Sequence, residues 1–333
     1  MAMRAVEAKA FGGPEVLTVT EVADPTAGPG EVVVEVAAAD VMFLDVALRS
    51  GSGVDFFPVT PPYVPGGAVA GVVRAVGAGV DASWIGRRVA TATAASAVGG
   101  GKPVGGYAER AVAKAEALTV IPEGVDFTQA AALVHDGRTA LTVAEVAGIG
   151  PDSRVLITAA GGGVGTLLVQ VAKAAGATVV AAARGRAKLQ LAQRLGADAV
   201  VDYSEPDWTD RVRSALGGAG VDIVFDGAGG DLGSRALATM ARGARIIGFG
   251  NAAGGFADFD HEDAAAREIT IVGLLELTKS DIDWEPALGR ALAEVAAGRL
   301  EVVVGQTFPL DRASAAHAAI EARTAVGRTV LTV

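Results

Sequence analysis

A chain of 333 residues is long enough for two domains, and with 51% hydrophobic and 20% charged residues its composition predicts a folded globular protein rather than a disordered one. The formal net charge of -10 opposes nonspecific binding to nucleic acid and to anionic membranes, so neither is an expected partner. Cysteine is absent, which excludes disulfides, a thiolate nucleophile and cysteine-bound zinc or iron–sulfur clusters.

The first residues of the chain are unlike a secretory signal. Arg4, Glu7 and Lys9 place charges where such a signal needs an apolar stretch. We therefore expect a cytoplasmic protein.

Residues 1–123 are expected to form a β-rich domain. Short runs of β-branched and alternating residues predict strands, and the Pro and Gly pairs between them predict turns. The predicted strands are 16–22, 31–41, 68–77, 87–93 and 107–113. The glycine-rich segment 96–106 is expected to be a flexible surface loop.

Residues 124–304 show a different pattern, in which short apolar strands alternate with helices. This alternation predicts a parallel sheet covered on both faces, and so an α/β fold. The predicted strands are 155–158, 178–183, 199–203, 221–227, 244–250 and 269–275. Strand character returns at 302–310 and 327–333, with a helix from Arg312 to Ala322 between them, so residues 305–333 are expected to rejoin the first domain.

The stretch TAAGGGVGTLLVQ (158–170) lies in a segment without charge from Val155 to Ala172. A membrane span is excluded because four glycines interrupt the segment, which is also barely long enough. A strand followed by a glycine turn and a helix is the geometry of a dinucleotide-binding loop. The spacing Ala159-x-x-Gly162-x-x-Gly165 is a variant of the usual fingerprint, and its position after a predicted strand supports this interpretation.

The residues that follow the next strand bear on the choice of cofactor. An NAD-binding protein usually has an acidic residue here, but this chain has none between Asp152 and Asp198. It has Arg184, Arg186 and Lys188 instead, and these cations favour a 2′-phosphate and hence NADPH over NADH. The alternative is a solvated helix start with surface cations.

Segments along nearly the whole chain resemble the medium-chain dehydrogenase/reductase superfamily, and within it the zinc-independent quinone oxidoreductases of the zeta-crystallin type. Among them are GGYAERAV, LGADAVVDY and VDIVFDGAGG, which stand in the order and spacing of that family. The matching segments are 42–51, 61–80, 105–112, 121–133, 159–177, 195–203, 221–230 and 308–333.

The resemblance implies a GroES-like, β-barrel-type catalytic domain (1–123 and 305–333), a Rossmann domain with a doubly wound parallel sheet (124–304), NADPH as cofactor and a homodimer. By position, the pyrophosphate would be held by Gly162, Gly163, Val164 and Gly165. The 2′-phosphate and ribose would be surrounded by Arg184, Lys188, Tyr203 and Arg323, to which the charge pattern adds Arg186. The nicotinamide would lie along Gly250, Asn251, Leu274 and Leu275, with Thr139 near its ring.

Two departures from the family pattern concern metal and substrate. Gly67-Ala68 stands where zinc enzymes have His-Glu, so no metal is expected. Met42 and Ala47 replace the Asn and Tyr that quinone reductases usually carry, and only Asp45 is retained, which makes the substrate pocket less polar.

Hydride transfer to a quinone or an enone needs alignment and a hydrogen-bond donor at the carbonyl, with no metal, and the final proton can come from solvent. His135, with Asp136 to orient it, could be such a donor, or an ordinary histidine at a helix start. Asp45 could position substrate or make a structural hydrogen bond, and Tyr63 could donate a proton or simply pack. Phe56 and Phe57 could form an apolar substrate wall or anchor their loop.

The leading hypothesis is an NADPH-dependent reductase of quinones or α,β-unsaturated carbonyls. The alternatives are a tailoring enoyl reductase acting on a larger apolar, polyketide-like substrate, and a noncatalytic NADPH-binding protein. His261 and His317 are expected to be exposed or structural.

Overall fold

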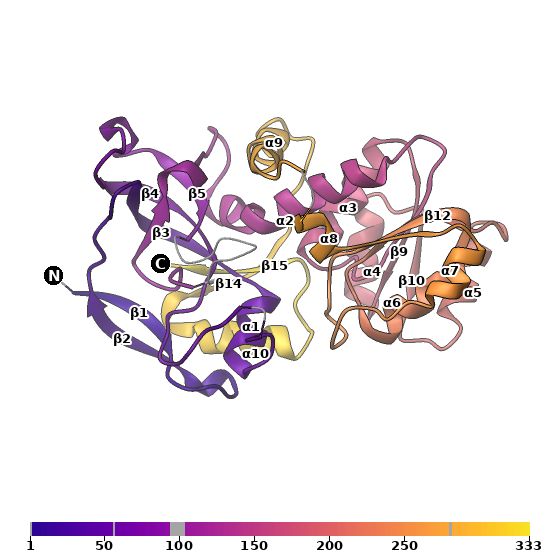
Figure 1. Cartoon of the computed structure of the whole chain (residues 1–333), viewed down its shortest axis with the longest axis horizontal. Coiled ribbons are helices and arrows are strands. Elements are labelled where there is room, and N and C mark those ends of the chain that lie inside the picture. Colours follow the sequence, from indigo (N-terminus) through magenta and orange to yellow (C-terminus); the bar gives the residue numbers. More distant parts are fainter. Residues whose placement is uncertain (1, 56, 94–103, 280–281) are drawn as a thin grey trace. The chain divides into compact units, whose positions relative to one another are not determined.

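The computed structural model describes residues 2–55, 57–93, 104–279 and 282–333 (Figure 1). Phe56 and most of the predicted surface loop, 96–103, lie outside these residues. The chain forms two compact units, Met1–Arg138 with Glu285–Val333, and Thr139–Trp284, and the limit at 138 falls within helix α2 (Phe127–Ala147). The predicted limits at 123 and 304 concern functional domains and stay a prediction.

The first unit is built on antiparallel strands. A hairpin of β1 (Ala2–Ala8) and β2 (Leu17–Ala23) accompanies a seven-stranded sheet ordered β14-β15-β3-β4-β5-β7, in which β6 also pairs with β3. The strands of this sheet are β3 (Glu31–Val41), β4 (Ala68–Val76), β5 (Arg88–Ala92), β6 (Arg110–Lys114), β7 (Thr119–Val120), β14 (Val304–Pro309) and β15 (Arg328–Thr332). Its helices, besides the start of α2, are α1 (Phe43–Ser50), α9 (Glu285–Ala296) and α10 (Ala313–Glu321).

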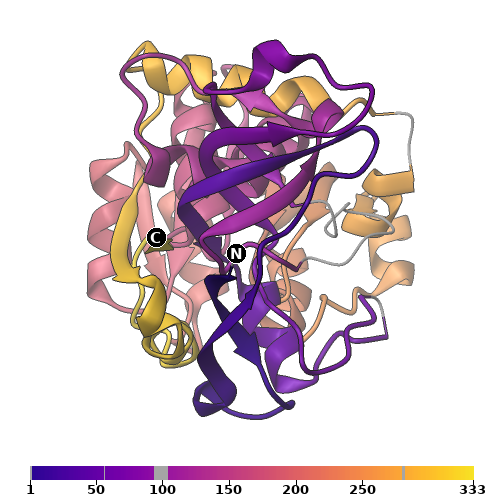
Figure 2. The ribbon, with the colours of Figure 1, turned by 90° about the vertical axis from the view of Figure 1, so that its left-hand side faces the viewer.

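The last segment of the chain belongs to the first unit. Strand β15 pairs antiparallel with β3, so that Leu331 lies opposite Ala39, and parallel with β14. Helix α10, yellow in Figure 2, packs on β14 and β15 and buries Ala313, Ala316 and His317. Small side chains of α10 therefore pack over the apolar strand residues on this face of the sheet.

The second unit is a six-stranded, wholly parallel sheet ordered β10-β9-β8-β11-β12-β13. The predicted α/β fold with a doubly wound sheet is confirmed by this order. The strands are β8 (Arg154–Ile157), β9 (Thr178–Ala183), β10 (Ala199–Asp202), β11 (Val221–Asp226), β12 (Met240–Gly248) and β13 (Thr270–Gly273). The helices are α3 (Gly163–Ala174), α4 (Arg186–Arg194), α5 (Trp208–Ala215), α6 (Gly230–Ala236), α7 (His261–Ala266) and α8 (Leu274–Lys279).

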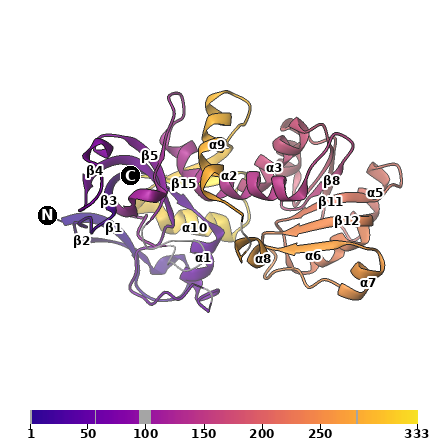
Figure 3. The same ribbon diagram turned by 45° about the horizontal axis from the view of Figure 1, so that its top comes forward.

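The direction of the strand order reverses between β8 and β11. Because parallel crossovers are right-handed, the helices that leave the two strands cover opposite faces of the sheet. Figure 3 shows α3 and α6 on opposite sides of the sheet. The loops after β8 and β11 therefore diverge at one edge, where doubly wound sheets bind their ligands.

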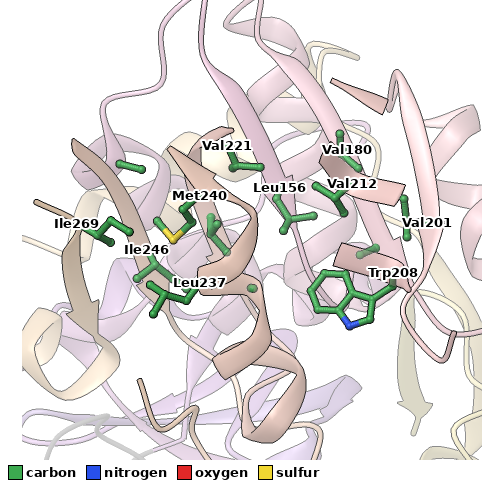
Figure 4. Close-up of a cluster of buried hydrophobic side chains, with 14 of the residues drawn as sticks. Leu156, Val180, Val201, Trp208, Val212, Val221, Leu237, Met240, Ile246 and Ile269 are labelled. Atoms are coloured by element: carbon green, nitrogen blue, oxygen red, sulfur yellow. The ribbon is translucent and has the colours of Figure 1, made fainter. Parts of the chain in front are cut away.

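One core of the second unit packs α5 against the sheet. Leu156, Val224 and Ile246 come from three neighbouring strands, and the fully buried Trp208 lies beside Val212 of α5 (Figure 4). The apolar runs that predicted buried strands supply these side chains. This core holds the strand ends, and with them the loops of the site, in fixed positions.

Three features differ from the sequence-based expectation. Helix α1 occupies 43–50, where no element was predicted, and β1 and β7 were also missed. The predicted strand 269–275 ends at Gly273, since α8 begins at Leu274.

Among the described residues no helix is both long and apolar enough to cross a membrane.

Candidate functional site

The glycine loop follows β8 and opens α3. Ala159 has a left-handed backbone (φ 51°), which turns the chain out of the sheet, and Gly162 is the N-cap of the helix. The first N–H groups of a helix have no partner inside it, so those of Gly163, Val164 and Gly165 present a positive end to a ligand. Such an end is suited to bind an anion, and the predicted role of this loop in holding a pyrophosphate stays a prediction.

Two glycines of this loop are needed for close packing. A Cβ at Gly165 would lie 2.5 Å from the carbonyl oxygen of Ala159, so a side chain would push α3 away from the loop. A Cβ at Gly161 would lie 2.5 Å from Cβ of Lys188. The side chain of Lys188, from α4, therefore lies directly against the glycine loop.

The cations predicted to select the cofactor gather where β9 meets α4. Arg184 follows the last residue of β9 and is exposed, and Gly185, in a left-handed conformation (φ 85°), caps α4. Arg186, the first residue of α4, is also exposed. The structure thus brings Arg184, Arg186 and Lys188 to the same end of α4.

The nearest carboxylates at this edge are already engaged. Asp202, at the end of β10, accepts hydrogen bonds from the Gly185 N–H (3.1 Å) and from the N–H (2.9 Å) and hydroxyl (2.5 Å) of Ser204. Although partial burial alone would raise the pKa of Asp202, these donors hold it below its usual value. Asp198 is bound by Lys173 and by the N–H of Val179. Both acids are thus engaged in local hydrogen bonds, whereas Arg184 and Arg186 are exposed.

A buried polar pair that the sequence analysis missed joins the two strands at the reversal point. The Thr158 hydroxyl donates to Oδ1 of Asp226 (2.6 Å) and accepts from the N–H groups of Gly227 and Ala228 (3.1 Å each). Asp226 also accepts from the N–H groups of Ala228 and Gly229. Burial raises the pKa of Asp226, and these hydrogen bonds oppose the rise. The only sequence signal was a polar residue at the end of each apolar strand.

The segment predicted along the nicotinamide follows β12 and touches the loop after β11. A Cβ at Gly250 would lie 2.3 Å from the carbonyl oxygen of Gly227, so glycine is required for this approach. Asn251 is half-buried in the same loop. Leu274 and Leu275 are the first residues of α8, and Leu275 is described here only by its backbone.

In the first unit, Asp45 is buried between helices and strands. Its Oδ2 accepts from the N–H of Met42 (2.8 Å), which caps α1, and from the hydroxyl of Tyr107 (3.2 Å). Burial raises the pKa of Asp45 to about 7. The Tyr107 hydroxyl also lies 3.1 Å from Nε2 of His317, whose pKa burial lowers to about 3. These contacts are those of a structural hydrogen bond, one of the two roles considered for Asp45.

His135 and Asp136 point to different partners. Nε2 of His135 lies 3.4 Å from the carbonyl oxygen of Gly67, and burial lowers its pKa to about 4. Asp136 instead faces Arg328 (3.3 Å), which forms a bidentate ion pair with the fully buried Asp40. Asp136 therefore belongs to a buried ion cluster, and among the described residues no contact joins its carboxylate to the His135 ring.

The remaining predicted residues occupy varied surroundings. Tyr63 packs against the core of the first unit, and its buried hydroxyl has no hydrogen-bond partner among the described residues. Met42 is buried at the start of α1. Arg323 is exposed in the first unit, just after α10, with a left-handed backbone (φ 56°). Thr139 is half-buried on α2, and Tyr203 follows β10 and packs partly on the core in Figure 4.

Comparison with known proteins gives the same two-part division. The family model "Alcohol dehydrogenase GroES-like domain" matches residues 28–123, and "Zinc-binding dehydrogenase" matches 163–293. Human quinone oxidoreductase is 30% identical over 319 residues, covering 95% of this chain and 93% of that protein. The chain belongs to the medium-chain dehydrogenase/reductase superfamily.

Two further members of this superfamily show its range. The 2-haloacrylate reductase of a Burkholderia species is 32% identical over 332 residues, with 96% of each chain covered. The crystal structure of Escherichia coli quinone oxidoreductase complexed with NADPH has a TM-score of 0.88 and 29% identity, and the match covers 99% of this chain and 100% of that one. The resemblance stated from the sequence, with its GroES-like and Rossmann parts, is confirmed.

The zinc in the name of one family model has no counterpart among the residues that the structure describes. No group of three His, Asp or Glu side chains there could hold a metal ion, and the sequence has no Cys. Gly67 stands where zinc enzymes of the superfamily carry a ligand, and its carbonyl faces His135.

Proposed function

We propose that this protein is an NADPH-dependent oxidoreductase that transfers hydride to a quinone or an α,β-unsaturated carbonyl compound without a metal ion. The names of the quinone oxidoreductase and 2-haloacrylate reductase relatives support both acceptor classes, since a quinone and a haloacrylate each hold a carbonyl conjugated to a carbon–carbon double bond. The E. coli neighbour in complex with NADPH supports the cofactor.

The observation that carries the choice of NADPH is the arrangement at the end of β9. Arg184 and Arg186 are exposed there, and Lys188 lies against the glycine loop. Asp202, at the end of β10, already accepts hydrogen bonds from Gly185 and Ser204. The three cations suit a 2′-phosphate, and the sequence has no acidic residue between β9 and Asp198 that could bind a ribose diol.

The protein's own contribution to the reaction is binding, orientation and exclusion of water. When bound, the nicotinamide supplies the hydride. The N-terminus of α3 would hold the pyrophosphate, and the loops that carry Gly227 and Gly250 would fix the position of the other half of the cofactor. His135 is uncharged at neutral pH, so it does not act as an imidazolium acid. The final proton can come from solvent.

We further propose a cytoplasmic homodimer. Strand β13 is at the edge of the parallel sheet and, among the described strands, pairs only with β12. An unpaired edge favours pairing with the same strand of a second copy. Light scattering on the purified protein tests the dimer, and a monomer would refute it.

The decisive experiment measures NADPH and NADH oxidation by the purified protein with simple quinones, enones and enoyl thioesters. Arg184→Ala and Arg186→Ala are compared with Arg242→Ala, which removes an exposed arginine near the start of β12 that pairs with Glu268. We expect turnover that prefers NADPH, and a dissociation constant for NADPH that rises about tenfold in the first two variants only, the loss of one charge-assisted phosphate contact.

The alternatives give different results in the same assay. Turnover confined to large enoyl thioesters would indicate a tailoring enoyl reductase, consistent with Met42 and Ala47 in place of polar residues. NADPH binding without turnover of any acceptor would indicate a noncatalytic NADPH-binding protein. Equal use of NADH and NADPH would refute the 2′-phosphate site.

A further inference from the structure

Thr158 and Asp226 lie where the sheet reverses direction, below the loops that the cofactor would contact. Both side chains are fully buried; Thr158 directly follows β8, and Asp226, 68 residues later, is the last residue of β11. Thr158 directly precedes Ala159, whose left-handed backbone starts the glycine loop. Any shift of Thr158 is thus passed on to the residues that open α3.

Asp226 organises the loop on the other strand. Its carboxylate accepts from Ala228 and Gly229, and its Oδ2 leaves so little room that a Cβ at Gly233 would lie 2.2 Å away. The backbone carbonyl of Asp226 accepts from Phe249 (2.9 Å) and Gly250 (3.1 Å). One residue therefore fixes both the β11 loop and the start of the β12 loop.

The two loops are joined further along by their backbones. Ala253 donates to Ala228 (2.7 Å), and Gly230 donates to Gly255 (2.9 Å). The Thr158 hydroxyl is the link from this pair of loops to the glycine loop, because it donates to Asp226 while accepting from Gly227 and Ala228. Arg184, at the adenosine end, is exposed just before α4, and none of the hydrogen bonds described for this network involves it.

We propose that Thr158 and Asp226 are a positioning pair that sets the nicotinamide-side loops against the pyrophosphate loop, and so controls the alignment for hydride transfer while leaving adenosine binding unchanged. This inference rests on the proposed NADPH-dependent reduction. Misplacement of a bound reactant by about 1 Å can cost on the order of 100-fold in rate, so a small displacement of these loops is enough to be measured.

The test compares Thr158→Val, which keeps the shape and removes the hydroxyl, with Thr158→Ser, which keeps the hydroxyl. Thr239→Val is the matched control, because Thr239 is also fully buried in this unit and its hydroxyl makes one hydrogen bond, to Ala236 (2.7 Å). Each variant is assayed for kcat with NADPH, for the isotope effect with NADPH deuterated at C4, and for binding of 2′,5′-ADP, which contains only the adenosine half.

In Thr158→Val we expect kcat to fall about 10- to 100-fold and the isotope effect to rise, while the affinity for 2′,5′-ADP stays within about twofold. Thr158→Ser and Thr239→Val should keep wild-type kcat. A wild-type kcat in Thr158→Val, or an equal loss of 2′,5′-ADP affinity, would overturn the proposal.

Two further experiments apply if Thr158→Val does not fold or if the wild-type protein is inactive. If Thr158→Val does not fold, Thr158→Ala, which also removes the hydroxyl that joins Asp226, takes its place with the same expectations. If the wild-type protein reduces no acceptor, the proposed reductase function is refuted. The positioning role of Thr158 and Asp226 is then tested by ligand binding alone. In that case Thr158→Val must weaken NADPH more than 2′,5′-ADP, and equal weakening would refute the positioning role.

Discussion

Asp45→Asn should make the stability of the first unit less dependent on pH between about pH 4 and pH 7. The carboxylate is buried, its Oδ1 has no hydrogen-bond partner among the described residues, and burial raises its pKa to about 7. In the unfolded chain the pKa of an aspartate is about 3.9. Between these two pKa values the folded protein therefore keeps a proton on Asp45 that the unfolded chain has lost. The stabilisation that this proton gives decreases as the pH rises toward 7. An asparagine keeps an acceptor for Met42 and Tyr107 and does not ionise.

The size of the effect follows from the pH range between the unfolded and the folded pKa of Asp45. One pH unit changes the relative free energy of unfolding by about 1.36 kcal/mol, and the slope decreases as Asp45 ionises near pH 7, so between pH 5 and pH 7 the wild type should lose about 2.3 kcal/mol relative to Asp45→Asn. The neighbouring His317, whose folded-state pKa is about 3, takes up a proton on unfolding below about pH 6.5 in both proteins, so its contribution cancels in the difference. Above pH 7 the two proteins should change in parallel.

Hydrogen exchange as a function of urea, read on peptides from α1 and β3 at pH 5, 7 and 8, gives the stability of the first unit alone. Asp81→Asn is a suitable control, since donation from Ser83 lowers the pKa of Asp81 and its contribution has the opposite sign. Parallel stability curves for wild type and Asp45→Asn between pH 5 and pH 7 would show that Asp45 does not titrate there, and would refute the reasoning.

Arg328→Met should destabilise the first unit by about 3–5 kcal/mol, because it leaves two buried carboxylates without their shared cation; the urea midpoint checks this, and an unchanged midpoint would contradict it. Gly161→Ala should lower the melting temperature by displacing Lys188, whereas Gly162→Ala, whose Cβ would have no neighbour within 3.3 Å, should leave it unchanged. Asp202→Ala should weaken NADPH binding more than NADH binding, since it frees the turn that presents the cations; equal weakening in titrations would exclude this role.

The strands and the glycine loop could be predicted because their signals are local. The uncharged run before Gly161, the glycine spacing and the cations after the next strand all lie within 35 residues, and periodicity alone indicates the elements. The end of β13 at Gly273 was misplaced because the apolar residues Leu274 and Leu275 fit a strand as well as a helix.

The buried polar contacts could not be predicted because they join distant segments. Thr158 and Asp226 are 68 residues apart, and Tyr107 and His317 are 210 apart. A polar residue at the end of an apolar run has many possible partners, and only the strand order selects one. His317 was expected to be exposed or structural, and the fold makes it a buried partner of Tyr107.

The position of β15 between β14 and β3 has a consequence for synthesis on the ribosome. The central strand of the first unit is made early, at residues 31–41, but its neighbour β15 is made only after the whole second unit. In the same way, Asp40 and Asp136 can form their ion pairs only after Arg328 has been synthesised. The second unit, residues 139–284, is complete earlier and can fold as the chain emerges. The first unit therefore completes its fold only after the second unit has been synthesised.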